Sequence, residues 1–235
     1  MKLIVFALLV LSSFASVCGQ IEGNPDNWCR GGFFTRDSQD FKIGTVKGAK
    51  TVKSYFFNDD PEDCPAGKNC RGKAYLVGGD KVIVARNYNG FACVWFTPVS
   101  GYETVGWVRA DTLRLADPVA KPPLSAWHGT WKYADNSISF TDNKLAGFLN
   151  VTGDALWKGL GDNVHIGELD GRFAPEGNVL EYSDGDDEYD CKATMRLVGE
   201  YLLVADNMKC GGVNVSFSGI YKKATALRRN RNPVR

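Results

Sequence analysis

Short runs of β-branched and aromatic residues recur along the chain, separated by glycine, asparagine and aspartate. Apolar residues do not recur at helical spacing over three turns, so the pattern predicts strands rather than helices. In residues 189–197 every odd position is apolar and every even position is polar. Such alternation is typical of a strand with one buried and one solvated face. Residues 87–90 end in Asn-Gly, which tolerates the positive φ angles of a hairpin turn.

The predicted strands fall into two groups. In the first half of the chain they cover residues 41–46, 52–57, 81–85 and 91–96. In the second half they cover residues 129–133, 137–140, 146–151, 164–173, 189–197 and 201–204, with Val215, Phe217 and Tyr221 in a last strand. We expect about eight strands in this half to form a small antiparallel barrel, because a barrel closes its own edges. The sequence therefore predicts an all-β protein.

A proline-rich segment, residues 117–126, separates the two groups of strands and contains three prolines. Proline fixes φ and lacks an amide donor, so we expect an extended, semi-rigid linker there. This predicts a β domain over residues 25–116 and an antiparallel β-barrel domain over residues 127–223. Residues 224–235 form a basic tail without apolar periodicity, which is typical of a solvated chain end.

Residues 1–19 have the layout of a secretory signal peptide: a positive start, a short apolar run and a small, mildly polar end. We expect cleavage near Gly19 and a secreted or periplasmic protein. Lipid attachment at Cys18 is a less favoured alternative, because Val17 stands where a lipoprotein signal has a small residue. No later run approaches the roughly 20 apolar residues of a transmembrane helix.

The six cysteines outside this leader are predicted to form disulfides, since an exported chain meets an oxidising compartment. Zinc is disfavoured because there is no C-x-x-C, and His128 and His165 stand apart from the cysteines. The spacing favours Cys191–Cys210, Cys64–Cys70 and Cys29–Cys93. The two other pairings of the four cysteines in the first half remain open.

Residues 73–86, 89–96 and 106–113 contain the patterns Y-L-x-x-G-D-x-V and G-W-V-x-x-x-x-L in that order. Together they resemble a bacterial Src-homology-3-like domain. The resemblance implies a binding module, often for cell-wall peptide or glycan. Residues 203–221 resemble the C-terminal β domain of uncharacterised secreted bacterial proteins, which implies no activity.

Tyr55, Tyr88 and Tyr102 are the candidate ligand contacts, because each is expected at a loop or strand end that could expose a flat ring with a polar tip. Ordinary packing is the competing interpretation for each of them. Trp107, in the closing strand of the Src-homology-3-like pattern, is interpreted as a core residue.

The remaining residues provide little support for other functions. Loss of Lys2 with the leader would leave 27 basic and 27 acidic side chains, so a globally basic nucleic-acid binder is disfavoured. There is no G-x-S-x-G and no phosphate-binding loop, and no pair of carboxylates is singled out. The acidic residues 184–190 are interpreted as a solvated hairpin rather than a calcium loop. We therefore expect neither an enzyme nor a cofactor or metal.

The leading hypothesis is a non-enzymatic binding protein that recognises cell-wall peptidoglycan through its Src-homology-3-like module. One alternative is an envelope inhibitor or immunity protein that blocks a wall hydrolase or toxin by protein contact. Another is a lipocalin-like carrier, although about eight strands can equally be filled by their own side chains.

Overall fold

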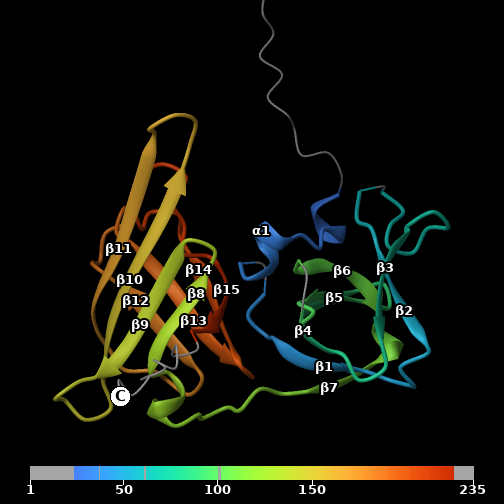
Figure 1. The fold of residues 1–235 in the computed structure, drawn as a ribbon, viewed down its shortest axis with the longest axis horizontal. Helices are drawn as coiled ribbons and strands as arrows, with labels where there is room; N and C mark the ends of the chain where they lie inside the picture. The colour runs from blue at the N-terminus through green and yellow to red at the C-terminus, as the bar shows by residue number, and fades with distance from the viewer. Residues whose placement is uncertain (1–23, 37, 61, 100–101, 225–235) are drawn as a thin grey trace, which may run out of the picture.

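The computed structural model of the chain describes residues 24–36, 38–60, 62–99 and 102–224. The predicted signal peptide, Cys18 and almost all of the basic tail lie outside these residues. The described chain is all-β, with two antiparallel sheets that lie side by side (Figure 1). In this part of the chain no helix is both long and apolar enough to cross a membrane.

The first module, residues 25–116, contains a seven-stranded sheet in the order β3-β2-β6-β5-β4-β1-β7. Its strands are β1 (Lys42–Val46), β2 (Lys53–Phe57), β3 (Arg71–Val77), β4 (Lys81–Tyr88), β5 (Phe91–Phe96), β6 (Thr104–Arg109) and β7 (Leu113–Ala116). A one-turn helix α1 (Gly31–Phe34) and 3₁₀ turns at Pro25–Asn27 and Ala110–Thr112 complete it. The four strands predicted in this half are confirmed.

The turn between β4 and β5 shows how the sequence sets the local structure. Asn89 and Gly90 both have positive φ angles, of 47° and 82°. Their register places Tyr88 opposite Phe91, so the predicted two-residue hairpin is confirmed.

The barrel module, residues 127–223, contains an eight-stranded sheet in the order β11-β10-β9-β8-β15-β14-β13-β12. Its strands are β8 (Gly129–Tyr133), β9 (Asn136–Asp142), β10 (Leu149–Lys158), β11 (Val164–Phe173), β12 (Val179–Ser183), β13 (Lys192–Val198), β14 (Tyr201–Asp206) and β15 (Gly219–Lys223). The edge strands β11 and β12 meet through side chains, since the Tyr182 hydroxyl accepts a 3.2 Å hydrogen bond from the Asp170 amide. The sheet is therefore a nearly closed barrel, as predicted.

Several boundaries in the barrel module differ from the prediction. Strand β12 was not predicted, and β10 continues to Lys158 instead of ending at residue 151. Strand β13 begins at Lys192, and Tyr189 lies in the preceding turn with 73% of its surface exposed. Its place in the alternating pattern is therefore coincidental. Val215 and Phe217 are buried as expected but precede the last strand.

Side chains fill the interior of the barrel. Large groups from the linker end, several strands and the segment before β15 are fully buried there, including Trp127, Phe140, Phe217 and Tyr221. The Tyr221 hydroxyl donates a 2.8 Å hydrogen bond to the Phe217 carbonyl oxygen. Burial holds the pKa of Tyr221 well above its ordinary value. A packed interior supports the filled-barrel alternative over a ligand carrier.

Three disulfides join the cysteines in the favoured pairs, Cys29–Cys93, Cys64–Cys70 and Cys191–Cys210. The first ties the N-terminal segment to β5, and the second closes the loop before β3. The third joins the start of the β13 region to the loop after β14. Each restricts the unfolded chain and so adds stability to a small module.

The first module has apolar side chains on both faces of its sheet. One face encloses an internal core that includes Leu76, Val94 and Val108. The other face carries Ile83, Trp95 and other buried groups of β4, β5 and β6. Alternate residues of a strand face opposite sides of the sheet, so the apolar runs of β4 and β5 place side chains on both faces. Both faces of these two strands are buried. Trp107 is also fully buried, which confirms its core role.

The second of these faces is shared with the barrel module. Val198, Leu203 and Ile220 face outward from the barrel and pack into one apolar cluster with residues of the first module, including Phe41 and Trp95. Their neighbours in sequence, such as Leu202 and Tyr221, point into the barrel. The two modules are therefore joined by a continuous apolar contact in addition to the linker, which runs beneath both in Figure 1 and ends in a 3₁₀ turn at Leu124–Ala126.

Candidate functional site

The three tyrosines predicted as ligand contacts lie in different parts of the first module. Tyr55 on β2 packs edge-on against Tyr75, with ring centroids 5.9 Å apart. Tyr88 at the end of β4 is half-buried and packs against Trp107 at 5.8 Å. Tyr102 precedes β6 and is almost fully exposed. Within the described residues no ring contact joins the three, so they form no single site, and ligand contact at each stays a prediction.

Cationic side chains accompany the tyrosines of β2 and β3. The Arg71 guanidinium lies 4.6 Å from the centroid of Tyr55, and the Lys53 ammonium lies 4.1 Å from that of Tyr75. Lys73 is exposed on the same side of β3, because side chains alternate along a strand. We refer to these five side chains as the β2–β3 face. Cations cover part of the ring surface of this face.

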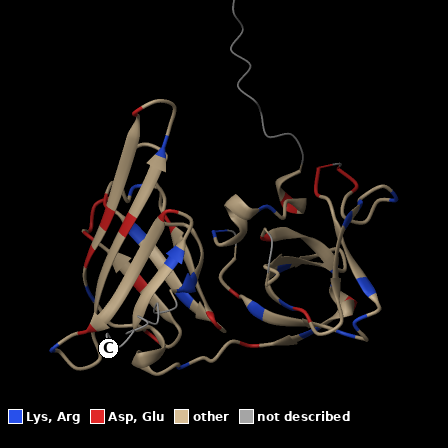
Figure 2. Ribbon diagram, in the orientation of Figure 1, with Lys and Arg blue, Asp and Glu red and all other residues tan. Residues whose placement is uncertain are grey.

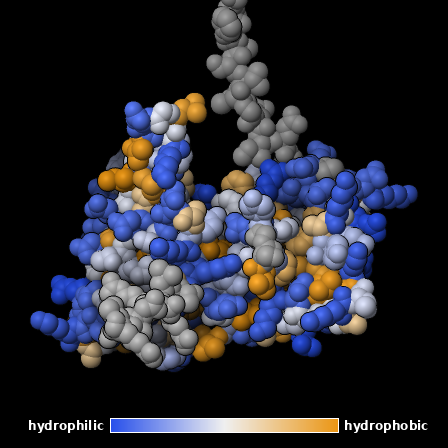
Figure 3. Space-filling model, viewed as in Figure 1, coloured by the Kyte–Doolittle hydropathy of each residue, from blue (hydrophilic) through white to orange (hydrophobic). Residues whose placement is uncertain are grey.

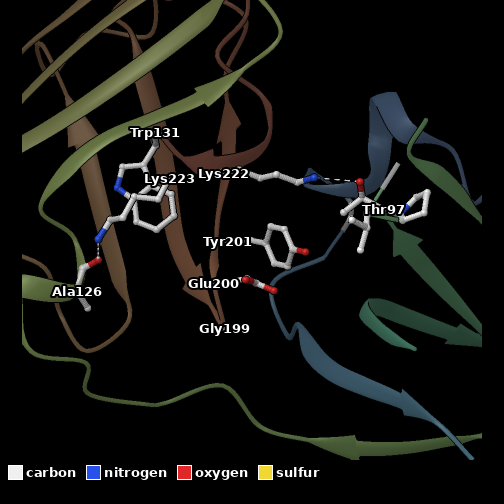
Figure 4. Close-up of a pocket in the computed structure, with 10 residues that line it drawn as sticks. Thr97, Ala126, Trp131, Gly199, Glu200, Tyr201, Lys222 and Lys223 are labelled. Carbon is white, nitrogen blue, oxygen red and sulfur yellow. Dashed lines mark hydrogen bonds between the residues drawn. The ribbon is translucent and has the colours of Figure 1, made fainter. Parts of the chain in front are cut away.

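A cleft of about 560 Å³ lies where the two modules meet (Figure 4). Its lining comes from Thr97, Pro98 and Val99 of the first module and from Ala126, Trp131, Gly199, Glu200, Tyr201, Lys222 and Lys223. A smaller hollow of about 260 Å³ is lined by the same Gly199–Tyr201 turn and by Ile43, Lys81 and Trp95. The turn between β13 and β14 therefore separates two hollows at the module boundary.

Aromatic rings form the apolar part of the cleft. The Tyr201 ring packs edge-on against Trp95 of the first module, with centroids 5.0 Å apart. The Trp131 indole is fixed from inside the barrel by a 2.8 Å hydrogen bond to the Trp127 carbonyl oxygen. Tyr201 is thus held by the packing that joins the modules, and Trp131 by the interior of the barrel.

Two adjacent lysines provide the positive charge. Lys222 donates a 3.0 Å hydrogen bond to the Thr97 hydroxyl, and Lys223 donates a 2.9 Å hydrogen bond to the Ala126 carbonyl oxygen. The Lys223 ammonium also lies 4.9 Å from the Trp131 ring centroid. Among the described residues, no carboxylate forms an ion pair with either ammonium. Figure 4 shows Lys222 reaching toward Thr97 of the first module and Lys223 pointing the other way, past Trp131 toward Ala126.

Two carboxylates, Glu200 and Glu103, lie next to aromatic rings at the module boundary. Burial first, and then the nearby negative charge of Glu200, raise the pKa of Tyr201. Glu103 accepts a 3.1 Å hydrogen bond from the Trp95 indole and a 3.4 Å bond from the Tyr133 hydroxyl. Burial and Glu103 similarly raise the pKa of Tyr133. Glu103 thereby links the first module to the barrel next to the cleft.

The histidines do not form a nucleophilic constellation in the described chain. His128 Nε2 lies 3.2 Å from a carboxylate oxygen of Asp142, and His165 Nδ1 lies 2.5 Å from the Val213 carbonyl oxygen. The closest group of metal-ligating residue types is Asp63 with Cys64 and Cys70, but these two sulfurs are bonded to each other and offer no thiolate. The cleft offers fixed charges and rings, which suit binding.

In comparisons with known proteins, no family model matches the chain, and no curated protein or solved structure does so either.

The residues of the cleft were not predicted from the sequence. Lys222 and Lys223 follow the last apolar residue of β15 and resemble an ordinary strand end. Glu200 lies in a turn that the sequence predicts only as a reversal between two strands. These residues meet the Thr97 loop only because the modules pack together, and no motif spacing encodes that contact. The one available signal was the uninterrupted apolar run at 202–204, which indicates a strand buried on both faces.

Proposed function

We propose that this protein is a non-enzymatic binding protein of the cell envelope and that the cleft between its modules holds a peptide of the cell wall. The observation that carries the proposal is the pair Lys222 and Lys223, whose ammonium groups line a cleft without a carboxylate partner in the described chain. The resemblance of the first module to Src-homology-3-like domains supports the choice of wall material.

The dimensions of the cleft support a small ligand. Clefts of about 300–1,000 Å³ that lie between domains are the usual places for such ligands. An ammonium has three N–H donors, and each lysine gives one to Thr97 or Ala126. The remaining donors can reach a bound carboxylate, and hydrogen bonds to charged groups contribute about 1.5–3 kcal/mol each.

The charge pattern favours a peptide over a plain anion. The lining includes Lys222, Lys223 and Glu200, so the cleft offers two positive charges and one negative charge. Stem peptides of peptidoglycan carry free carboxylates together with an amino group. Their carboxylates match the lysines, and their amino group matches Glu200. The Tyr201 ring supplies apolar surface between these charges.

The test is isothermal titration of the purified protein with a soluble disaccharide–tetrapeptide fragment of peptidoglycan. We expect saturable binding by the native protein. The double variant Lys222→Gln/Lys223→Gln removes both charges and keeps side chains of similar length. Loss of one charged hydrogen bond corresponds to about tenfold weaker binding, so the double variant is expected to bind at least tenfold more weakly.

The matched control is Lys53→Gln/Lys73→Gln, which removes two lysine charges from the β2–β3 face instead. We expect its affinity to stay within about twofold of the native value. Loss of binding in this control, with the cleft variant unaffected, would move the site to the β2–β3 face. An absence of binding by the native protein would contradict the proposal as a whole.

A further inference from the structure

A small hollow of about 90 Å³ lies on the boundary between the modules, apart from the cleft. One wall is the segment after α1, with Thr35, Arg36 and Phe41, and the other is the outer face of β13 and β14. The hollow shares no lining residue with the cleft. In the space-filling view the modules touch along their boundary, where hydrophilic residues lie beside hydrophobic ones (Figure 3).

The barrel wall of the hollow presents the guanidinium of Arg196. Met195 and Leu197, its neighbours on β13, are buried in the barrel core, so Arg196 points outward. The register places it opposite Leu203, which belongs to the apolar cluster shared by the modules. Arg196 is half-buried, and its guanidinium has no hydrogen-bond or ion-pair partner in the described chain. It therefore has all five of its N–H donors free for a ligand.

The first module contributes a second guanidinium and a buried hydroxyl. Arg36 donates to the Gly32 carbonyl oxygen from Nε and Nη2, at 3.3 and 2.8 Å, and its Nη1 has no partner among the described residues. Thr35 is only 6% exposed, and its hydroxyl also forms no hydrogen bond within this part of the chain. Buried hydroxyls are normally hydrogen-bonded, so Thr35 is suited to a bound acceptor. Figure 2 shows basic positions on both modules where they face one another.

The carboxylates around the hollow are engaged elsewhere. Glu181, on the strand next to β13, accepts a 2.7 Å hydrogen bond from the Thr194 hydroxyl, and Asp40 pairs with Lys42 at 2.9 Å. Within the described residues no carboxylate forms an ion pair with either arginine of the hollow. Asp37 lies outside the described residues. The hollow thus combines two positive charges with a boundary that is partly withdrawn from water.

We propose that this hollow binds a phosphate group through Arg36 and Arg196. A guanidinium presents its donors in a planar fork that matches phosphate oxygens, and such charge-assisted hydrogen bonds are about twice as strong as neutral ones. The Thr35 hydroxyl can donate one more. The volume lies below the roughly 300–1,000 Å³ of clefts for whole small molecules, so it suits a single functional group. Inorganic phosphate and the end of a phosphate monoester both carry this group.

The phosphate site is independent of the proposed function. Its ligand contacts both modules at the opposite end of the β14 face from Tyr201, which lines the cleft. A protein that binds phosphate here but no wall peptide would support the phosphate site and contradict the cleft proposal. The reverse result would do the opposite.

The experiment is an NMR titration of the isotope-labelled full-length protein with sodium phosphate at constant ionic strength. We expect the backbone amides of Thr35 and Arg196 to shift along one saturable curve in the millimolar range. Equal shifts with glycerol phosphate would show that a monoester enters, whereas shifts with inorganic phosphate alone would assign the site to the free ion. Acetate should bind more weakly, because a carboxylate has fewer acceptor oxygens. Equal affinity for acetate would overturn the assignment to phosphate.

Arg36→Gln and Arg196→Gln should each weaken phosphate binding by about tenfold or more, since each removes charged hydrogen bonds. Arg196→Lys keeps the charge but not the fork, so its affinity should lie between those of Arg196→Gln and the native protein. Asp37→Asn should not weaken binding.

The matched control is Arg114→Gln, which removes an exposed arginine from β7 and should stay within about twofold of the native affinity. Unchanged denaturant midpoints without phosphate show that the variants fold. No saturable shift in the native protein, or native affinity in both Arg36→Gln and Arg196→Gln, would refute the phosphate site.

Discussion

Replacing Leu203 with alanine tests whether the two modules form one structural unit. Leu203 is 2% exposed and points away from the barrel interior into the apolar cluster shared with the first module. In an isolated barrel its side chain would face solvent. The cost of the substitution therefore measures the contact between the modules and depends little on the stability of the barrel itself.

The expected magnitude follows from burial. A buried leucine replaced by alanine costs about 2–5 kcal/mol through lost transfer free energy and the cavity that remains. An exposed leucine replaced by alanine changes stability by about 0.5 kcal/mol or less. Because Leu203 lies at a boundary that can partly close around a cavity, we expect about 2–3 kcal/mol.

The assay is denaturant unfolding followed by tryptophan fluorescence, which reports Trp95 in the first module and Trp127 in the barrel. We expect Leu203→Ala to lower the unfolding midpoint of both modules, because the buried contact links them. Leu145→Ala, an exposed leucine in the same module, is the control and should leave the midpoint unchanged. Equal midpoints for the two variants would refute the shared core.

Two further predictions concern the disulfides and the cleft tyrosine. Replacing the Cys29–Cys93 pair with serines opens a loop with a sequence separation of 64 and should cost about 4 kcal/mol of unfolding free energy, against about 2 kcal/mol for Cys64–Cys70 with a separation of 6. Equal losses in denaturant unfolding would contradict this ranking. The raised pKa of Tyr201 predicts a stability contribution that is present below the pKa of the unfolded phenol and lost as pH rises through the folded value. Carbon NMR of this ring should show its pKa lowered in Glu200→Gln but still above the ordinary value, since burial is the larger cause.

Much of the fold could be predicted from local pattern. The Asn-Gly sequence after β4 predicts a turn through its backbone conformation, and the alternation within β13 predicts a strand through the direction of its side chains. Both signals depend only on residues that are neighbours in sequence. The Cys191–Cys210 pair followed from the same reasoning, because Cys191 takes an inward-facing position one hairpin before Cys210. For the four cysteines of the first half the sequence only favoured the observed pairs and left the two other pairings open.

The contact between modules could not be predicted in the same way. The apolar run that contains Leu203 indicates burial on both faces of its strand, but it does not identify the residues that cover the outer face. In the structure Phe41 and Trp95 belong to the cluster that covers Leu203 and Ile220. The cleft follows from that packing, so its residues are dispersed in sequence. Tyr55, Tyr88 and Tyr102 were predicted as ligand contacts because an aromatic residue type is visible in a sequence, whereas the location of a cleft is not.

The most direct test of the account is an NMR titration of the isotope-labelled protein with the disaccharide–tetrapeptide fragment. We predict that the backbone amides of Thr97, Tyr201 and Lys222 shift together, because these residues line one cleft from both modules. Shifts confined to Lys53 and Tyr75 on the β2–β3 face, or no shifts at all, would contradict it.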